Sequence, residues 1–274
     1  MLPAADFCVN GRVNPLFQAM PTYHIGCSGF HYRDWKGVFY PPEVPPRKWF
    51  AYYCTQFATL ELNVTFYKMP ELAALENWHA QSPAGFQFAV KAPRLVTHYK
   101  KFGPEAAPVL ADFYGTVREG LRDKLGPVLF QLPPKAAYSE ELLGRILEQL
   151  DPKFHNVVEF RHPSWWDGAI FRELARHDVT FVGQSHPLPL PDEAVVNTPL
   201  AYYRFHGVPE LYKTPYTAEF MTRVAAEITA APGVRDVYLY FNNGMGGAGV
   251  LNAQELQTLL NCPPYGGAQT PKQP

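Results

Sequence analysis

The sequence has few cysteines, no long apolar run and almost no net charge. Its four cysteines form no Cys-x-x-Cys pair and stand at no zinc-finger spacing from histidine, so we expect free thiols in a reducing compartment. No apolar run is long enough to span a bilayer, and residues 1–18 lack the basic start and apolar core of a signal peptide. A net charge of −1 creates no overall field that would attract nucleic acid or a membrane surface. These absences predict a cytoplasmic protein with no membrane partner, and any anion site must then be a local cluster of cations.

The chain length fits one domain between two tails. A chain of 274 residues is long enough to bury a large core, and no internal repeat or linker divides it. We expect an N-terminal tail over residues 1–22 and a single domain over residues 23–261. Residues 262–274, rich in Pro, Gly and Gln, are predicted to form a flexible C-terminal tail.

Short strand-like runs alternate with helical patterns along this domain. The runs are rich in β-branched and aromatic residues and cover residues 23–29, 59–67, 86–91, 127–132, 156–160, 179–182, 201–206 and 237–243. Helical spacing of apolar residues marks residues 47–57, 72–80, 105–125, 139–150, 170–177, 217–230 and 253–260. Residues 183–199 are Pro-rich without a helical pattern, so we expect an irregular region around strand six. Strand, helix, strand repeated about eight times predicts a single-domain α/β fold, a (β/α)8 barrel of the TIM type.

A doubly wound open sheet is the alternative to this barrel. Such a sheet would carry a glycine-rich phosphate-binding turn after an early strand. Residues 27–30, Cys-Ser-Gly-Phe, match that fingerprint poorly. The closed barrel is therefore favoured.

The most informative stretch is an apolar strand that ends in charged residues. Residues 156–162 run from a buried strand into Glu159, Arg161 and His162. Burying such groups costs stability unless they are paired, so either an internal Glu–Arg ion pair or a functional site is expected here. Polar residues recur at the C-terminal ends of the other strands, where TIM-type barrels place their active sites. This recurrence favours a functional site.

Side-chain alternation predicts which of these residues point into the barrel mouth. Along the second strand, Glu61, Asn63 and Tyr67 are expected to share one face. Thr65 belongs to the same face. The residues that we assign to substrate binding are Trp35, Asn63, Tyr67, Lys91, His98, Gln131, Arg161, Trp165, Arg204, Asn242 and Asn243.

Fixed cations outnumber acids at these strand ends. The cations are Lys91, Arg94, Arg161 and Arg204, and the acids are Glu61 and Glu159. A cationic mouth on a neutral protein indicates an anionic ligand such as a phosphate, a carboxylate or a nucleic-acid fragment. Aromatic side chains nearby, Trp35 and Trp165 among them, are candidates to stack on a base or a sugar ring.

Two carboxylates and two histidines are the candidate catalytic residues. Glu61 or Glu159 would act as general base, and His206 or His162 as general acid. Alternatively, the two glutamates form the acid/nucleophile pair of a glycosidase, or each only neutralises a neighbouring Arg or Lys. A divalent metal held by both glutamates and His206 is a further alternative, although no His-x-His or His-Glu-x-x-His spacing supports it. We predict no cofactor.

A series of ordered motifs also points to a known family. The motifs are Gly26-Cys27-Ser28-Gly29-Phe30 with Tyr32, Trp35 and Phe39-Tyr40-Pro41, Glu61-Leu62-Asn63-Val64-Thr65-Phe66-Tyr67, Lys91 with Thr97-His98, Lys124-Leu125-Gly126-Pro127, Gln131-Leu132-Pro133-Pro134, Glu159-Phe160-Arg161-His162 with Ser164-Trp165, Tyr203-Arg204-Phe205-His206-Gly207, and Tyr240-Phe241-Asn242-Asn243 with Asn252-Ala253. In these motifs, from about residue 23 to residue 260, the chain resembles the YecE-like proteins, known as domain of unknown function 72. The resemblance implies a TIM-type barrel and no established reaction. Relatives often carry an Asp at the end of strand six, where this chain has Gln184-Ser185-His186.

Three functions are consistent with these residues. The first is an enzyme with a cationic pocket at the barrel mouth, acting on a phosphorylated or nucleic-acid-derived substrate. The second is a glycosidase or sugar isomerase that uses the paired glutamates, which would then be free of arginine partners. The third is a non-catalytic protein that binds a nucleotide or nucleic acid.

Overall fold

A computed structural model describes residues 8–9, 12–13 and 20–262 of the chain. Most of the two predicted tails lies outside the described residues. Within the first tail, β1 (Cys8–Val9) pairs with β2 (Arg12–Val13) in antiparallel register. In the described part of the chain, no helix has both the length and the apolar character needed to cross a membrane.

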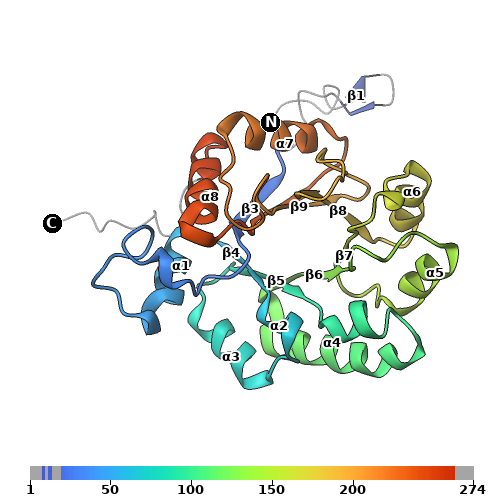
Figure 1. The fold of residues 1–274 in the computed structure, drawn as a ribbon, viewed down its shortest axis with the longest axis horizontal. Coiled ribbons are helices and arrows are strands. Elements are labelled where there is room, and N and C mark those ends of the chain that lie inside the picture. The colour runs from blue at the N-terminus through green and yellow to red at the C-terminus, as the bar shows by residue number, and fades with distance from the viewer. Residues whose placement is uncertain (1–7, 10–11, 14–19, 263–274) are drawn as a thin grey trace.

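Eight parallel strands form the centre of the molecule (Figure 1). They are β3 (Thr22–Cys27), β4 (Thr59–Leu62), β5 (Gln87–Lys91), β6 (Leu125–Gln131), β7 (Asn156–Glu159), β8 (Thr180–Ser185), β9 (Leu200–Phe205) and β10 (Asp236–Phe241). Their order in the sheet, β3-β10-β9-β8-β7-β6-β5-β4, places the first strand beside the last. The predicted (β/α)8 barrel is confirmed, and each of the eight predicted strand runs overlaps one of these strands.

The ring closes unevenly between β3 and its two neighbours. β3 pairs with β10 along its whole length, from Thr22 to Cys27. Its backbone pairing with β4 is limited to a single bridge, between Ser28, directly after β3, and Glu61. Beside this bridge, the hydroxyl of Tyr53 accepts a hydrogen bond from the backbone N–H of Cys27 and donates one to the carbonyl of Thr59. One side chain thus replaces backbone hydrogen bonds that the strands do not make.

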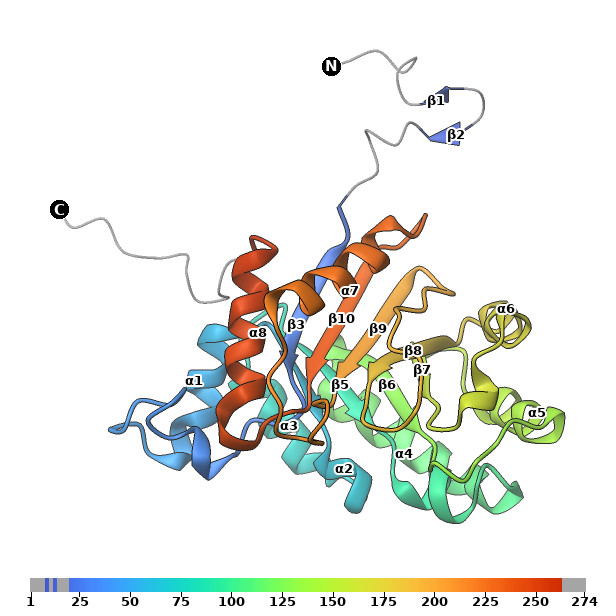
Figure 2. The ribbon, with the colours of Figure 1, turned by 45° about the horizontal axis from the view of Figure 1, so that its top comes forward.

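Helices surround the sheet in the positions that the sequence predicts (Figures 1 and 2). They are α1 (Trp49–Gln56), α3 (Leu72–Gln81), α4 (Ala107–Leu121), α5 (Glu140–Gln149), α6 (Gly168–Arg176), α7 (Ala218–Ala230) and α8 (Ala248–Leu259). Ser139 caps α5, because its side chain accepts a hydrogen bond from the N–H of Leu142. α8 begins five residues before its predicted start, directly after Gly247, whose φ of 85° suits glycine. No helix lies among residues 186–199 between β8 and β9, as expected for this irregular region.

The barrel interior is filled by apolar and tyrosine side chains. Along β6 and β7, Leu129 and Val157 belong to the interior cluster, whereas Val128 and Val158 pack under the helices. The interior cluster consists of Ala89, Leu129, Val157, Val182, Tyr202, Tyr238 and Tyr240. Burying a side chain such as Leu or Val stabilises the fold by about 1.5–3 kcal/mol. This layer separates the two ends of the barrel, so the polar groups at each end form separate sites.

The second strand is shorter than the sequence predicts. β4 ends at Leu62, Asn63 already has helical backbone angles, and the short helix α2 (Val64–Tyr67) follows. The predicted alternation from Glu61 to Tyr67 on one strand face is therefore wrong.

A tertiary contact explains this correction. The hydroxyl of Thr65 donates to the carbonyl oxygen of Lys91 at 2.6 Å, which fixes α2 against the end of β5. Thr65 is buried, while Tyr67 is 69% exposed and Val64 is also exposed. Strand-forming residues in this segment misled the prediction because strand propensity depends on the neighbours that a segment finds in the fold.

Candidate active site

Arg204 on β9 joins two carboxylates that come from opposite sides of the barrel. Its Nε and Nη2 donate to the carboxylate oxygens of Glu61 at 2.9 and 2.6 Å, and its Nη1 donates to Glu159. Tyr202, on the same face of β9, donates its hydroxyl to Glu61 at 2.6 Å. All four side chains are buried, where such charge-assisted bonds are strong and the loss of one partner is costly. We call Glu61, Arg204 and Glu159 the buried triad.

A second set of polar side chains covers the buried triad. Arg161 donates from Nε to Glu159, and its Nη2 lies 3.1 Å from Nε2 of His206. The other ring nitrogen of His206, Nδ1, lies 2.9 Å from the side-chain amide of Asn242, which directly follows β10. His206 is itself fully buried. The structure therefore brings together Glu61, Glu159, Arg161, Arg204, His206 and Asn242.

Burial and the surrounding charge together fix the protonation states of Glu159 and of two histidines. Burial alone would raise the pKa of Glu159, but the guanidinium groups of Arg161 and Arg204 outweigh it and hold the pKa well below its usual range. Burial, and then the charge of Arg161, lowers the pKa of His206 well below 6.5. For the same reasons the pKa of His186 falls to about 4. His206 is thus neutral at neutral pH, and Glu159 is a carboxylate.

Lys91 at the end of β5 has far fewer partners. Its Nζ donates to Oε1 of Gln131 at 2.9 Å and lies 4.0 Å from the ring centroid of Phe66. Gln131 is held in turn, because its Nε2 donates to the carbonyl of Leu132 at 2.7 Å. Only 8% of Lys91 is exposed, and among the described residues no carboxylate forms an ion pair with it. Burial and the charge of Arg204 lower the pKa of Lys91 to about 7.

Lys91 lines a cavity of about 300 Å³ at the barrel mouth. Tyr67 and Tyr212 at its rim are exposed, and Asn63 contributes a buried Oδ1 without a hydrogen-bond partner among the described residues. Beside the rim, the guanidinium of Arg94 lies 5.6 Å from the ring centroids of both Tyr67 and Tyr99. The cavity is lined by Tyr32, Asn63, Phe66, Tyr67, Lys91, Tyr212, Asn242, Gly244 and Met245.

The balance of charge at the mouth differs from the prediction. Arg204 and Arg161 both bond to carboxylates of the buried triad, so these two cations and two acids balance. His98 near Lys91 has a pKa of about 4, lowered by burial and then by the charge of Lys91, and is neutral. The uncompensated positive charge at the mouth therefore comes from Lys91 and Arg94 rather than from four cations.

Two predicted ligand-stacking residues are corrected by the structure. Trp35 is fully buried and donates from Nε1 to the carbonyl of Gly244. Trp165 is also fully buried, donates to the carbonyl of Ala136 and stacks on Phe160 with ring centroids 3.9 Å apart. Neither indole ring has a free face, so both stabilise the loops at the mouth instead of contacting a ligand.

Two further predicted residues lie apart from the buried triad. His162 bonds through Nδ1 to the hydroxyl of Ser164 and caps the short helix at Pro163–Trp165. Asn243 is fully buried and donates to the carbonyl of Thr214 at 3.0 Å. These contacts give both residues a local structural role, which argues against His162 as the general acid.

Phe66 and Tyr202 were not predicted as site residues, although both contact the polar groups at the mouth. Side chains alternate along a strand, so Tyr202 lies on the same face of β9 as Arg204, and its position was predictable. Phe66 was assigned to a strand, which would have directed its ring away from Lys91. The metal alternative is also weakened, because both carboxylates bond to guanidinium groups and no metal-binding group of three or more His, Cys, Asp or Glu occurs within the described residues.

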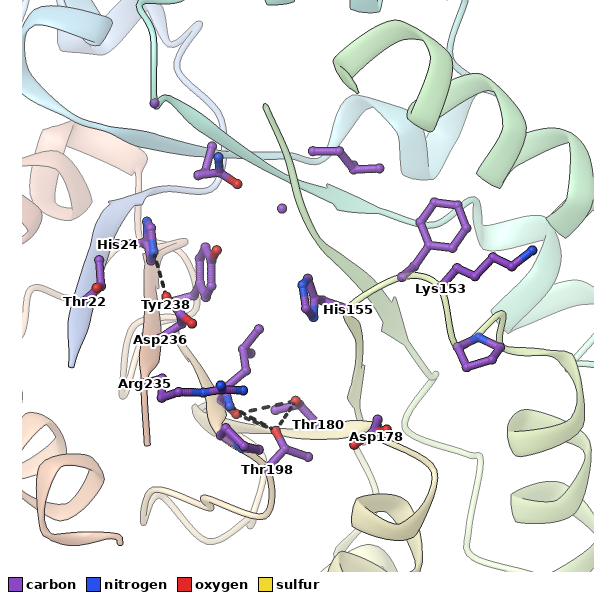
Figure 3. Close-up of a pocket in the computed structure, with 18 residues that line it drawn as sticks. Thr22, His24, Lys153, His155, Asp178, Thr180, Thr198, Arg235, Asp236 and Tyr238 are labelled. Atoms are coloured by element: carbon purple, nitrogen blue, oxygen red, sulfur yellow. Dashed lines mark hydrogen bonds and ion pairs between the residues drawn. The ribbon is translucent and has the colours of Figure 1, made fainter. Parts of the chain in front are cut away.

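A larger cavity, of about 570 Å³, opens at the opposite end of the barrel (Figure 3). Nε2 of His24 lies 3.7 Å from the carboxylate of Asp236, and the His24 ring stacks on Tyr238. The other charged and titratable residues around this cavity are exposed: Lys153, His155, Asp178 and Arg235. No residue predicted for substrate binding or catalysis lines it.

Comparison with known proteins agrees with the motifs. A family model described as "Protein of unknown function DUF72" matches residues 24–274. UPF0759 protein YunF of Bacillus subtilis (strain 168) is 24% identical over 271 residues, which cover 87% of this chain and 94% of that protein.

Solved structures of the same family have the same fold. A DUF72 family protein of Thermotoga maritima MSB8 matches with a TM-score of 0.79 and 28% identity, covering 87% of this chain and 99% of its own. One from Enterococcus faecalis V583 matches with a TM-score of 0.75 and 17% identity, covering 88% and 96%. The chain therefore belongs to the DUF72 family of proteins of unknown function.

Proposed function

We propose that the protein is an enzyme that binds a small anionic substrate, phosphorylated or nucleic-acid-derived, in the cavity at the barrel mouth. The observation that carries this proposal is the state of Lys91. A buried amine that has one neutral acceptor, and no carboxylate partner in the described part of the chain, destabilises the fold. Strongly perturbed titratable groups in a cleft are typical of functional sites.

An anion in this cavity would supply the partner that Lys91 lacks. Phosphate or carboxylate oxygens beside Nζ would favour its protonated form and form charge-assisted hydrogen bonds. The amides of Asn63 and Asn242 line the same cavity and can orient a polar substrate. The exposed rings of Tyr67 and Tyr212 suit a base or a sugar above the anion.

In this proposal the buried triad has a structural role beneath the substrate cavity and takes no part in the chemistry. Glu61 and Glu159 accept hydrogen bonds from Arg204, so neither is free to act as nucleophile or proton acceptor. The glycosidase alternative is therefore not favoured. Lys91, poised between its two protonation states near neutral pH, replaces the glutamates as the group that exchanges a proton with the substrate.

The test combines ligand screening with one substitution. Phosphate, nucleotides, sugar phosphates and short oligonucleotides are screened by thermal shift on the wild type and on Lys91→Met. A ligand at about 100 times its Kd adds about 2.7 kcal/mol to stability, and we expect such a shift in the wild type and its loss in the variant. Turnover of any hit is then assayed with both proteins.

The melting temperature of the free variant separates a functional lysine from a structural one. Because Met removes a poorly paired buried amine, Lys91→Met without ligand should be as stable as the wild type or more stable. The exposed Lys101→Met is the matched control for loss of one positive charge. The proposal fails if no anion stabilises the wild type. If Lys91→Met also melts below the wild type, Lys91 has a structural role instead.

A further inference from the structure

Two buried lysines in this chain have opposite surroundings. Nζ of Lys124 donates to the carbonyls of His79 and Ser82, each at 2.6 Å, and to the Ser82 hydroxyl at 3.0 Å. All three of its N–H donors are therefore used, and it holds the end of α3 in place. Lys91 is equally buried, at 8% exposed against 7%, but has the single acceptor on Gln131. Its Nζ also lies 4.0 Å from the Phe66 ring centroid, and the residue lines the mouth cavity.

The charged groups around Lys91 come from every side of the barrel mouth. They are Glu61 on β4, Glu159 and Arg161 at the end of β7 and Arg204 on β9, and the neutral His98 follows β5. Because the two arginines balance the two glutamates, burial dominates and the pKa of Lys91 falls to about 7. A much larger share of its amine is therefore neutral at neutral pH than at the ordinary pKa of about 10.4.

We propose that Lys91 forms a covalent imine with the carbonyl carbon of a small aldehyde or ketone that enters the mouth cavity. The inference rests on the proposed function and narrows its substrate to an anionic carbonyl compound. It depends on three features of the geometry. Lys91 lines an open cavity, no carboxylate of the described residues forms an ion pair with its Nζ, and the Phe66 ring 4.0 Å from Nζ excludes water from one side.

The step balances without an external oxidant or reductant. The nitrogen lone pair of neutral Lys91 attacks the carbonyl carbon, a C–N bond forms, and the π electrons move to oxygen. Nitrogen loses one proton and oxygen gains one, which gives a carbinolamine. The oxygen then takes up a second proton from water and leaves as water while nitrogen forms the C=N bond, which gives the protonated iminium. Loss of its remaining N–H proton to water returns that proton and leaves the imine. The amides of Asn63 and Asn242, which line the cavity, are placed to bond the oxygen in these steps.

Reductive trapping on the wild-type protein tests this directly. Glycolaldehyde is small enough for the cavity, and cyanoborohydride reduces an imine to a stable secondary amine. After brief exposure at pH 7, peptide mass mapping measures the labelling rate of each lysine. We expect Lys91 to be labelled at least tenfold faster than exposed Lys101, with buried Lys124 slower than both. The Lys91 rate should level off above about pH 7, while that of Lys101 keeps rising.

The outcomes separate the imine from the proposed function. Labelling of Lys91 no faster than Lys101 overturns the imine, even if an anion stabilises the wild type and not Lys91→Met. Fast labelling of Lys91 without stabilisation by any anion supports the imine and overturns the anionic substrate. If an anion that stabilises the protein also slows the labelling of Lys91, the anion and the aldehyde bind in the same cavity, which supports both proposals. Because the measurement uses the wild type, it does not depend on how a variant folds.

Discussion

At the C-terminal mouth of the barrel, charged side chains are buried and bonded to one another, whereas at the N-terminal end they are exposed and loosely paired. Arg204 at the mouth is 1% exposed and bonds to two carboxylates. Asp236 at the other end is half exposed and lies 3.7 Å from its partner (Figure 3). The N-terminal cavity is nonetheless the larger, at about 570 Å³ against about 300 Å³.

The larger cavity is therefore not the one that is lined by buried and interdependent polar groups. Exposed pairs contribute little because water solvates each charge separately. Buried charges need partners, so the arrangement at the mouth is interdependent, and the one poorly paired member, Lys91, stands out. The following substitutions test whether the two ends differ in energy as they differ in geometry.

The largest difference is expected for Arg204→Met. This change leaves Glu61 and Glu159 buried with fewer partners, so the free energy of unfolding should fall by about 3–5 kcal/mol. The matched change at the other end is Arg235→Met, where an exposed side chain is replaced and a change of about 0.5 kcal/mol or less is expected. Urea unfolding measures both. Equal losses would contradict the comparison.

A smaller difference is expected for tyrosine hydroxyls in the barrel interior. Tyr202→Phe removes the hydrogen bond to the Glu61 carboxylate, and bonds to charged groups contribute about 1.5–3 kcal/mol. Tyr238→Phe, in the same cluster but nearer the N-terminal end, should cost less than about 1 kcal/mol. Chemical denaturation of both variants gives the values. A larger loss in Tyr238→Phe would mean that the N-terminal end also contains a strong polar network.

The smallest effect is expected for Asp236→Asn. The pair with His24 is long and half exposed, so its loss should change stability by about 0–1 kcal/mol. Burial lowers the pKa of His24, and Asp236 raises it in part. Removing the carboxylate should therefore lower the His24 pKa further, which an NMR titration measures. A stability loss above about 2 kcal/mol would mean that the N-terminal end also contains strongly bonded polar groups.

The sequence predicts which polar residues gather at the barrel mouth better than it predicts how they bond to one another. Strand patterning and alternation placed Glu159, Arg204 and His206 at the mouth, because those signals are local. Which carboxylate bonds to which guanidinium depends on contacts across the barrel, so the prediction left the ion pairs as an alternative. The alternative of internal Glu–Arg ion pairs describes the buried triad. It does not explain Lys91, which has no such pair among the described residues.

Two predictions were wrong because they also depended on contacts between distant parts of the chain. The segment after Glu61 is rich in strand-forming residues, and a side-chain bond from Thr65 to β5 turns it into a helix. Trp35 and Trp165 were placed at the mouth correctly, but whether an indole is exposed depends on the loops that pack over it. Local patterns carry no information on either contact.

The weak junction between β3 and β4 also determines where the barrel can open. A Cβ at Gly26 would lie 2.5 Å from the carbonyl of Thr59, so the two strands approach closely only because glycine stands there. One bridge and the hydroxyl of Tyr53 hold them together. Native-state opening should therefore start at this junction, and the amide of Cys27 should exchange its hydrogen sooner than amides between β3 and β10. Glu61 lies at that junction, so the same fluctuation would transiently admit water to the buried triad.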